Sequence, residues 1–307
     1  MRPPPIVVYR EFAPSEPLRA PVRSFFTFTR AAAVEDTRRR RPIYEAVFGA
    51  GDSFSSPLFA DGHVSLTLTL DHACTPQGRW IDGVRPVATV LGALSAVGPA
   101  HAPDRAEMVG VYFRAGGAAL LGVPSSAVTD RVVHLGDLWG APATDLAEQI
   151  CAEGELARIE RLERTMLSRL ELTRSSAASL DCAGLAAWAV ASRGRVSVER
   201  MADAAGVSRQ CLARRFRDSV GVAPKLYCTL ARFQAGLAYA GRGADVDWAT
   251  VAVDLGYADQ SHMIREFRRF SSLTPNDLAS GRWFHPFIER ARGYLDLSRR
   301  RSSSLRS

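Results

Sequence analysis

The pattern of hydrophobic and polar positions changes its period once along the chain, near residue 140. Before that point every second residue of HVSLTLTL (63–70) is apolar, which is typical of a half-buried β-strand. VATVLGAL (87–94) and EMVGVYFRA (107–115) predict further strands, and GGAALLGVP (116–124) predicts a short helical segment. The first 140 residues are therefore expected to be rich in β-structure, as a sandwich or a barrel.

After that point the apolar spacing is that of amphipathic helices. It runs from residue 144 to about residue 173, and Gly154 interrupts it and is expected to divide it into two helices. The apolar side packs either on the strands of the same domain or on a second copy of the chain. RSSAASLDC (174–182) is small and polar, as linkers are, and helical spacing resumes behind it.

These patterns predict an α+β protein with two domains. We expect a β-rich N-terminal domain over residues 1–173, for sensing or dimerisation, and a linker over residues 174–181. An all-α domain follows over residues 182–295, and residues 296–307 form a basic, serine-rich tail that is expected to be disordered.

The all-α domain contains an internal near-repeat. GVSRQCLARRFRDSVGVAP (206–224) aligns with GYADQSHMIREFRRFSSLTP (256–275) when Ser208 and Asp259 are taken as helix N-caps. Counted from the cap, both copies have a large apolar residue at the fourth position and an arginine at the sixth. Both also have a phenylalanine at the eighth position and a proline at the sixteenth. These pairs are Leu212 and Met263, Arg214 and Arg265, Phe216 and Phe267, and Pro224 and Pro275.

Each copy follows a second short helix that ends in glycine. These helices are SVERMADAAG (197–206) and DWATVAVDLG (247–256), with Ala202 and Ala252 four residues before the glycine. Helix, glycine turn and helix make a helix-turn-helix, whose second helix enters the DNA major groove. A helix over residues 224–241 would hold the two units at a fixed separation, which should be near 34 Å for successive major-groove faces.

A helical bundle without DNA binding is the alternative, with the repeated apolar residues and prolines as core and punctuation. It does not explain why an arginine recurs at the same outward position in both copies. The charge also favours DNA. Residues 193–307 carry 20 Arg and Lys against 11 Asp and Glu, a net charge of +9, whereas residues 1–192 carry 19 against 21.

Residues 179–280 resemble the DNA-binding domain of the AraC/XylS family. The resemblance rests on Ala252, Gly256-Tyr257, Asp259-Gln260-Ser261, Arg265, Phe267 and Thr274-Pro275, and on the matching residues of the first copy. Met263 replaces a usual aromatic residue, and Ser272 replaces a usual glycine. The resemblance implies a bacterial, cytoplasmic transcription regulator and activator. Its partners would be double-stranded DNA and RNA polymerase, with a small-molecule effector or a homodimer formed through the N-terminal domain.

Two recognition helices are predicted, over about residues 208–218 and 259–270. The residues expected to face DNA are Arg209, Gln210, Arg214, Gln260, Ser261, His262, Arg265 and Arg268. Among these, the expected base contacts are Gln210, Arg214, Gln260 and Arg265, because arginine pairs with guanine and glutamine with adenine. Arg268 lies farther along its helix, where a phosphate contact and a solvated charge are equally compatible with the sequence.

The usual catalytic and cofactor motifs are absent. The sequence has no G-x-S-x-G, H-E-x-x-H or Walker A motif, and no G-x-G-x-x-G motif in a nucleotide-binding context. Its five cysteines are scattered without a C-x-x-C pair, which favours free thiols in a reducing compartment, and no stretch is long enough for a membrane span. We expect no catalytic site, metal or cofactor. An enzyme or protein-interaction domain fused to a helix-turn-helix module is the alternative function.

Overall fold

The structure is a computed structural model that describes residues 6–31, 54–55, 59–60, 62–70, 72–74, 80–82, 87–97, 101–102, 106–173, 180–241 and 246–279. The strands are β1 (Ile6–Phe12), β2 (Val22–Ala31), β3 (Phe54–Ser55), β4 (Ser65–Thr69), β5 (His72–Cys74), β6 (Trp80–Asp82), β7 (Val87–Leu91), β8 (His101–Ala102), β9 (Ala106–Phe113) and β10 (Val132–His134). Three short 3-10 helices are η1 (Glu16–Leu18), η2 (Gly117–Leu121) and η3 (Ser125–Ala127). The first α-helices are α1 (Leu135–Trp139), α2 (Ala141–Cys151) and α3 (Glu155–Thr173). The others are α4 (Cys182–Ala191), α5 (Val198–Ala204), α6 (Arg209–Val220), α7 (Pro224–Ala240), α8 (Trp248–Asp254), α9 (Gln260–Ser271) and α10 (Pro275–Ala279).

The N-terminal part is built on a six-stranded antiparallel sheet of order β1-β2-β9-β4-β7-β10. In and next to β4, Val64, Leu66, Leu68 and Leu70 are buried as predicted. Ser65 and Thr69 are buried as well, so the strand is largely buried on both faces rather than half-buried. The strands expected over 87–94 and 107–115 are present but end earlier, at Leu91 and Phe113. Residues 117–121 form the expected helical segment, as a 3-10 helix.

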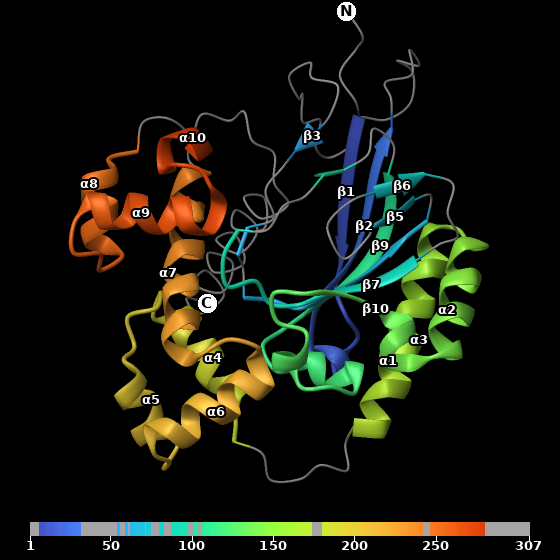
Figure 1. The fold of residues 1–307 in the computed structure, drawn as a ribbon, viewed down its shortest axis with the longest axis horizontal. Helices are drawn as coiled ribbons and strands as arrows, with labels where there is room; N and C mark the ends of the chain where they lie inside the picture. Colours follow the sequence, from blue (N-terminus) through green and yellow to red (C-terminus); the bar gives the residue numbers. More distant parts are fainter. Residues whose placement is uncertain are drawn as a thin grey trace, which may run out of the picture.

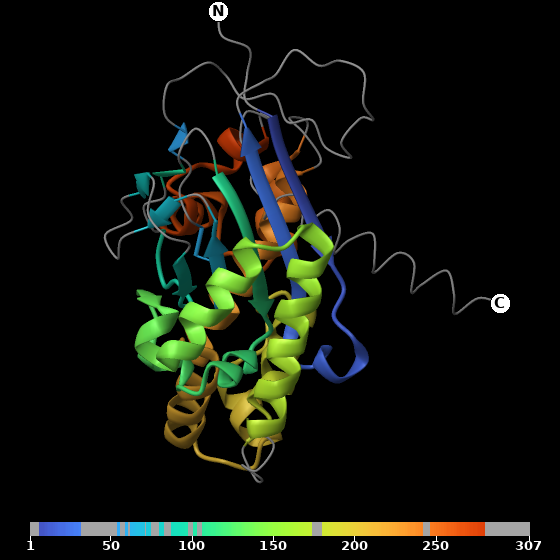
Figure 2. The ribbon, with the colours of Figure 1, turned by 90° about the vertical axis from the view of Figure 1, so that its right-hand side faces the viewer.

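Helices α2 and α3 cover one face of this sheet (Figures 1 and 2). Gly154 separates them as predicted, and α3 contacts β2 and β9 through its buried residues Ile159, Leu162 and Met166. Most of the apolar stripe of α3 is therefore buried against its own domain, whereas Leu156 is 66% exposed. The described strands form one open sheet and two short pairs rather than the expected sandwich or barrel, because helices rather than a second large sheet bury its face.

The C-terminal part is helical, and α7 is its central element. In Figure 1, α5 and α6 lie at one end of α7, and α8, α9 and α10 lie at the other. Helix α3 ends at Thr173 and α4 begins at Cys182, with most of the predicted linker between them outside the described residues. The extension after residue 279 and the tail over 296–307 also lie outside them, so the domain boundaries stay a prediction.

Candidate nucleic-acid interface

The two predicted recognition helices are α6 and α9, and each begins at the expected cap. The hydroxyl of Ser208 accepts a hydrogen bond from the backbone N–H of Cys211 at 3.2 Å. The carboxylate of Asp259 accepts one from the N–H of His262 at 2.6 Å. Such bonds satisfy N–H groups that have no partner within the helix and so fix where it starts.

The helices in front of them are capped as well. Ser197 caps α5 by accepting from the N–H of Arg200 at 3.2 Å, and Asp247 caps α8 by accepting from Ala249 and Thr250. The repeat read from the sequence is therefore a repeat in structure, with helix, turn and capped helix in both copies.

One side of each recognition helix is buried in the hydrophobic core. Leu212 and Phe216 of α6, like Met263 and Phe267 of α9, are completely buried. The two phenylalanines pack edge-on against the central helix α7, Phe216 on Tyr227 at 5.5 Å and Phe267 on Phe233 at 5.0 Å between ring centroids. The repeated apolar positions thus anchor both recognition helices to one rigid helix.

Gly236 of α7 makes the second of these contacts possible. A Cβ atom at this position would lie 2.6 Å from the Cζ atom of Phe267, far inside a normal contact distance. Only glycine lets α9 approach α7 this closely.

The opposite side of each helix is exposed. Gln210 and Arg214 are exposed on α6, and Gln260, Ser261, Arg265 and Arg268 are exposed on α9. The arginines at equivalent positions, Arg214 and Arg265, therefore both point away from the core. The structure brings each predicted set together on the outer side of one helix.

Arg209 is exposed but carries a contact that the sequence did not indicate. Its guanidinium pairs with the carboxylate of Glu199 on α5 at 3.0 Å. The backbone N–H of Glu199 itself and the Arg209 guanidinium hold the pKa of that carboxyl below its usual value. Both side chains face solvent, so the pair orients Arg209 more than it stabilises the fold.

His262 is half-buried rather than fully exposed. Its Nε2 atom lies 3.5 Å from Oε1 of Glu266, one turn farther along α9, and its ring meets the buried ring of Tyr257 edge-on at 5.4 Å. Burial raises the pKa of Tyr257, and the Arg232 guanidinium lies over the same ring at 5.1 Å. His262 therefore has less free surface for DNA than the other predicted residues.

A second feature that the sequence did not indicate lies at the far end of each recognition helix. We call it the interdomain clasp: Ala60, Val97, Ser125 and Thr129 of the N-terminal part bind Ser219, Gly221, Arg269 and Phe270. At α6, the hydroxyl of Ser125 donates to the carbonyl oxygen of Ser219 at 2.6 Å, and that of Thr129 donates to Gly221 at 2.7 Å. These bonds satisfy carbonyl groups at the end of the helix.

At α9, backbone N–H groups of the N-terminal part bind the carbonyl groups at the end of the helix. The N–H of Ala60 donates to the carbonyl oxygen of Phe270 at 3.0 Å, and the N–H of Val97 donates to that of Arg269 at 3.2 Å. The N-terminal part thus contacts the last turn of both recognition helices. No local sequence signal marks these residues, since each bond joins segments far apart in the chain.

The described part of the chain meets neither the requirements of a metal site nor those of a membrane-spanning helix. No group of three or more His, Cys, Asp or Glu side chains among those residues is placed to hold a metal ion. No helix within the same residues is long and apolar enough to cross a membrane.

The sequence matches one family model, described as a helix-turn-helix domain, over residues 201–280. No curated protein matches the chain. Solved structures of ToxT from Vibrio cholerae match it weakly. A 1.65 Å structure has a TM-score of 0.43 at 11% identity, covering 74% of this chain and 94% of that chain. The structure of ToxT bound to an unsaturated fatty acid has a TM-score of 0.41 at 11% identity, and the match covers 74% of this chain and 90% of that chain. The structure of ToxT bound to (E)-4-(8-methylnaphthalen-1-yl)but-3-enoic acid has a TM-score of 0.42 at 10% identity, and the match covers 74% of this chain and 94% of that chain.

Two copies of helix, turn and capped helix, each with an exposed polar side, define a DNA-binding class of fold. Together with the family match, they make residues 201–280 a helix-turn-helix domain of the AraC type. The chain therefore carries a DNA-binding helix-turn-helix domain.

Proposed function

We propose that the protein recognises a specific operator with α6 and α9 in successive major-groove segments on one side of the duplex. The observation that carries the proposal is the recurrence of an exposed arginine, Arg214 and Arg265, at the same position of two helices that share one central helix. Helix α7 has 17 residues and is about 25 Å long. The proposal requires the two recognition helices to lie about one turn of DNA apart, near 34 Å.

The residues at the start of each helix divide by role. Gln210 and Arg214 of α6, and Gln260 and Arg265 of α9, are exposed in the N-terminal half of their helices, the part of a recognition helix that meets base edges. Arginine can donate two hydrogen bonds to guanine, and glutamine can pair with adenine. Ser261 adds a hydroxyl beside Gln260. Arg209 and His262 also have contacts to Glu199 and Glu266, which binding to DNA would have to replace or accommodate.

The N-terminal domain, in this proposal, controls the DNA-binding part, either by sensing a small molecule or by forming a homodimer. The interdomain clasp supports control, because the same domain contacts the ends of both recognition helices. RNA polymerase would be the further partner of a regulator that activates transcription. No described residue favours an enzymatic role for the N-terminal domain.

In-vitro selection from random double-stranded DNA with the full chain tests the proposed function. Enriched sequences should contain two conserved segments whose centres lie about 10 base pairs apart. Enrichment of no sequence, or of a single short segment, would contradict the use of both helices. Mapping the selected motif in the source genome would then identify the regulated genes.

A further inference from the structure

A polar cavity lies between the sheet and the first turn of α3, away from the recognition helices. Its volume is about 270 Å³. This is slightly below the 300–1,000 Å³ that is usual for drug-sized ligands, so a small metabolite would fit. Its lining contains four charged side chains, two threonines and two apolar residues: Arg10, Glu107, Glu155, Arg158, Thr27, Thr29, Met108 and Val109.

The strand register explains why these side chains meet. Arg10, Thr27 and Val109 form one row across β1, β2 and β9, and Thr29 and Glu107 form another. Paired residues on neighbouring strands share a face of the sheet. Helix α3 begins over this face, so its first turn places two more charged side chains above the rows.

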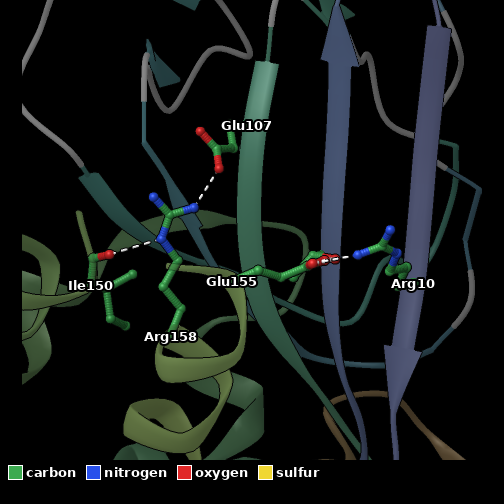
Figure 3. A network of polar contacts seen from close by, with 6 residues as sticks. Arg10, Glu107, Ile150, Glu155 and Arg158 are labelled. Atoms are coloured by element: carbon green, nitrogen blue, oxygen red, sulfur yellow. Dashed lines mark hydrogen bonds and ion pairs between the residues drawn. The ribbon is translucent and has the colours of Figure 1, made fainter. Parts of the chain in front are cut away.

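The four charges form two pairs of opposite sign (Figure 3). Arg10 pairs with Glu155, which also accepts a hydrogen bond from the hydroxyl of Thr27 at 2.8 Å. Arg158 pairs with Glu107, and its Nε–H donates to the carbonyl oxygen of Ile150 at 3.0 Å.

Such an arrangement contributes little to folding. Partly buried ion pairs roughly offset their own desolvation, and well-packed apolar residues of similar volume often stabilise a fold as well or better. The Arg158 side chain is only 14% exposed, whereas that of Glu107 is 37% exposed and reaches the opening. Toward the described residues, Arg158 uses two of its five N–H groups, which leaves donors for a ligand.

The presence of both signs decides which ligand chemistry fits. A simple anion attracted to Arg158 would be repelled by Glu107 and Glu155, and a simple cation would be repelled by the two arginines. A molecule with a carboxylate and a protonated amine on neighbouring atoms meets both signs at once. The buried Val109 offers apolar contact to its remaining atoms.

We propose that this cavity binds a free amino acid, a small zwitterion, as the effector of the regulator. The proposal rests on the sensing role proposed above. Its carboxylate pairs with the guanidinium of Arg158 and its ammonium group with the carboxylate of Glu107.

The position of the cavity gives such a ligand a connection to the DNA-binding part. At the other end of α3, Arg169 donates from Nε to the carbonyl oxygen of Leu120 at 2.9 Å and lies over the ring of Trp139 at 4.6 Å. Leu120 belongs to η2, which contacts α6. A ligand at Arg158 therefore acts on the helix that holds a segment against the first recognition helix.

The test is a binding screen of the full chain, without DNA, against each of the twenty standard L-amino acids, by thermal shift and titration calorimetry. At least one amino acid should raise the melting temperature saturably. Its methyl ester and its N-acetyl derivative, which each lack one of the two charges, should bind at least tenfold more weakly. Absence of binding by all twenty, or binding of either derivative as tight as that of the amino acid itself, overturns the proposal.

Matched variants place the ligand. Arg158→Gln should weaken binding at least tenfold, as should Glu107→Gln, whose more exposed side chain makes it the safer substitution for folding. Arg164→Gln, at an exposed position of the same helix, should bind as the unmodified chain does. Unchanged binding by the folded Arg158 and Glu107 variants overturns the assignment. Binding to the selected operator, measured on the same preparations, reports separately on the proposed DNA function.

Discussion

Ser272 ends the second recognition helix in a left-handed backbone conformation, with φ of 63°. The equivalent residue of the first unit, thirteen positions after its cap, is Gly221, with φ of 101°. A residue with a Cβ atom pays for this conformation and glycine does not. The departure from the usual glycine that the sequence showed at Ser272 is thus a point of local strain in the structure.

Ser272→Gly should therefore stabilise the protein by about 0.5–1 kcal/mol. Chemical denaturation of the full chain measures the change. Ser272→Ala is the matched control, because alanine removes the hydroxyl but keeps the unfavourable φ, and it should give no gain. Equal stability of the glycine and alanine variants would show that the strain is absent.

Arg268 lies in the last turn of α9 and is exposed, too far from the helix start for a base contact. Arg268→Ala should weaken binding to the operator and to unrelated DNA alike. It should also reduce the slope of log affinity against log salt by about one, as for a lost phosphate contact. Titrations at several salt concentrations measure both effects, with Arg164→Ala on α3 as a remote control. A loss confined to the operator would instead assign Arg268 to base reading.

At the scale of single helices, the caps define where the DNA-binding elements begin. Asp247 is the most heavily used cap, since its carboxylate accepts from the Thr250 hydroxyl at 2.6 Å and from the N–H groups of Ala249 and Thr250. The hydrogen bond from the Thr250 hydroxyl, followed by those from the backbone, lowers the pKa of Asp247. A lowered pKa in the folded state stabilises the fold above the unfolded pKa, near 3.9, and this contribution is lost as the pH falls.

Asp247→Ala should consequently lower the melting temperature at pH 7, and the difference from the unmodified chain should shrink below about pH 4. Melting curves from pH 7 to pH 3 provide the measurement. Asp254→Ala, at the other end of α8, removes a carboxylate without removing the cap. A difference that stays constant over this range would mean that the Asp247 charge is not what caps the helix.

The sequence predicted these helices well, because their caps and apolar spacing are set by residues within one or two turns. Ser208, Asp259, Phe216 and Phe267 all have the predicted local role. Strand β2 was not singled out, since its consecutive residues Ser24 to Thr27 are buried on both faces and leave no alternation.

Contacts between distant segments could not be read in the same way. Glu199 lies ten residues from Arg209, and Ser125 lies 94 residues from Ser219. Neither pair follows a period, so only the fold shows that they meet. Of the predicted interface, the outward side of each helix was accessible from sequence, whereas the pairing of Arg209 with Glu199 was not.

At the scale of the whole molecule, the interdomain clasp joins the N-terminal part to both recognition helices. Gly221 allows it at α6, because a Cβ atom there would lie 3.0 Å from Oγ1 of Thr129 and 3.1 Å from Cβ of Ala93. The two ends differ in kind, with side-chain hydroxyls at α6 and backbone N–H groups at α9. The α6 end can therefore be weakened by substitution without touching the α9 end.

Thr129→Val should destabilise the protein by about 1 kcal/mol, because it leaves the carbonyl oxygen of Gly221 without the hydroxyl that now binds it. Hydrogen exchange should accelerate for backbone N–H groups at the end of α6 and stay unchanged at the end of α9. Thr129→Ser keeps the hydroxyl and should preserve protection at both ends. If the valine and serine variants exchange alike, the hydroxyl does not hold the two parts together.

The central claim is that α6 and α9 read separate segments of one operator through Arg214 and Arg265. The most direct measurement is the affinity of Arg214→Ala and Arg265→Ala for the selected operator and for a set of its single base-pair variants. Each substitution should cost about 1–3 kcal/mol and remove discrimination in one segment only, a different segment for each arginine. Unchanged affinity for the operator, or loss of discrimination in the same segment by both variants, would contradict the assignment.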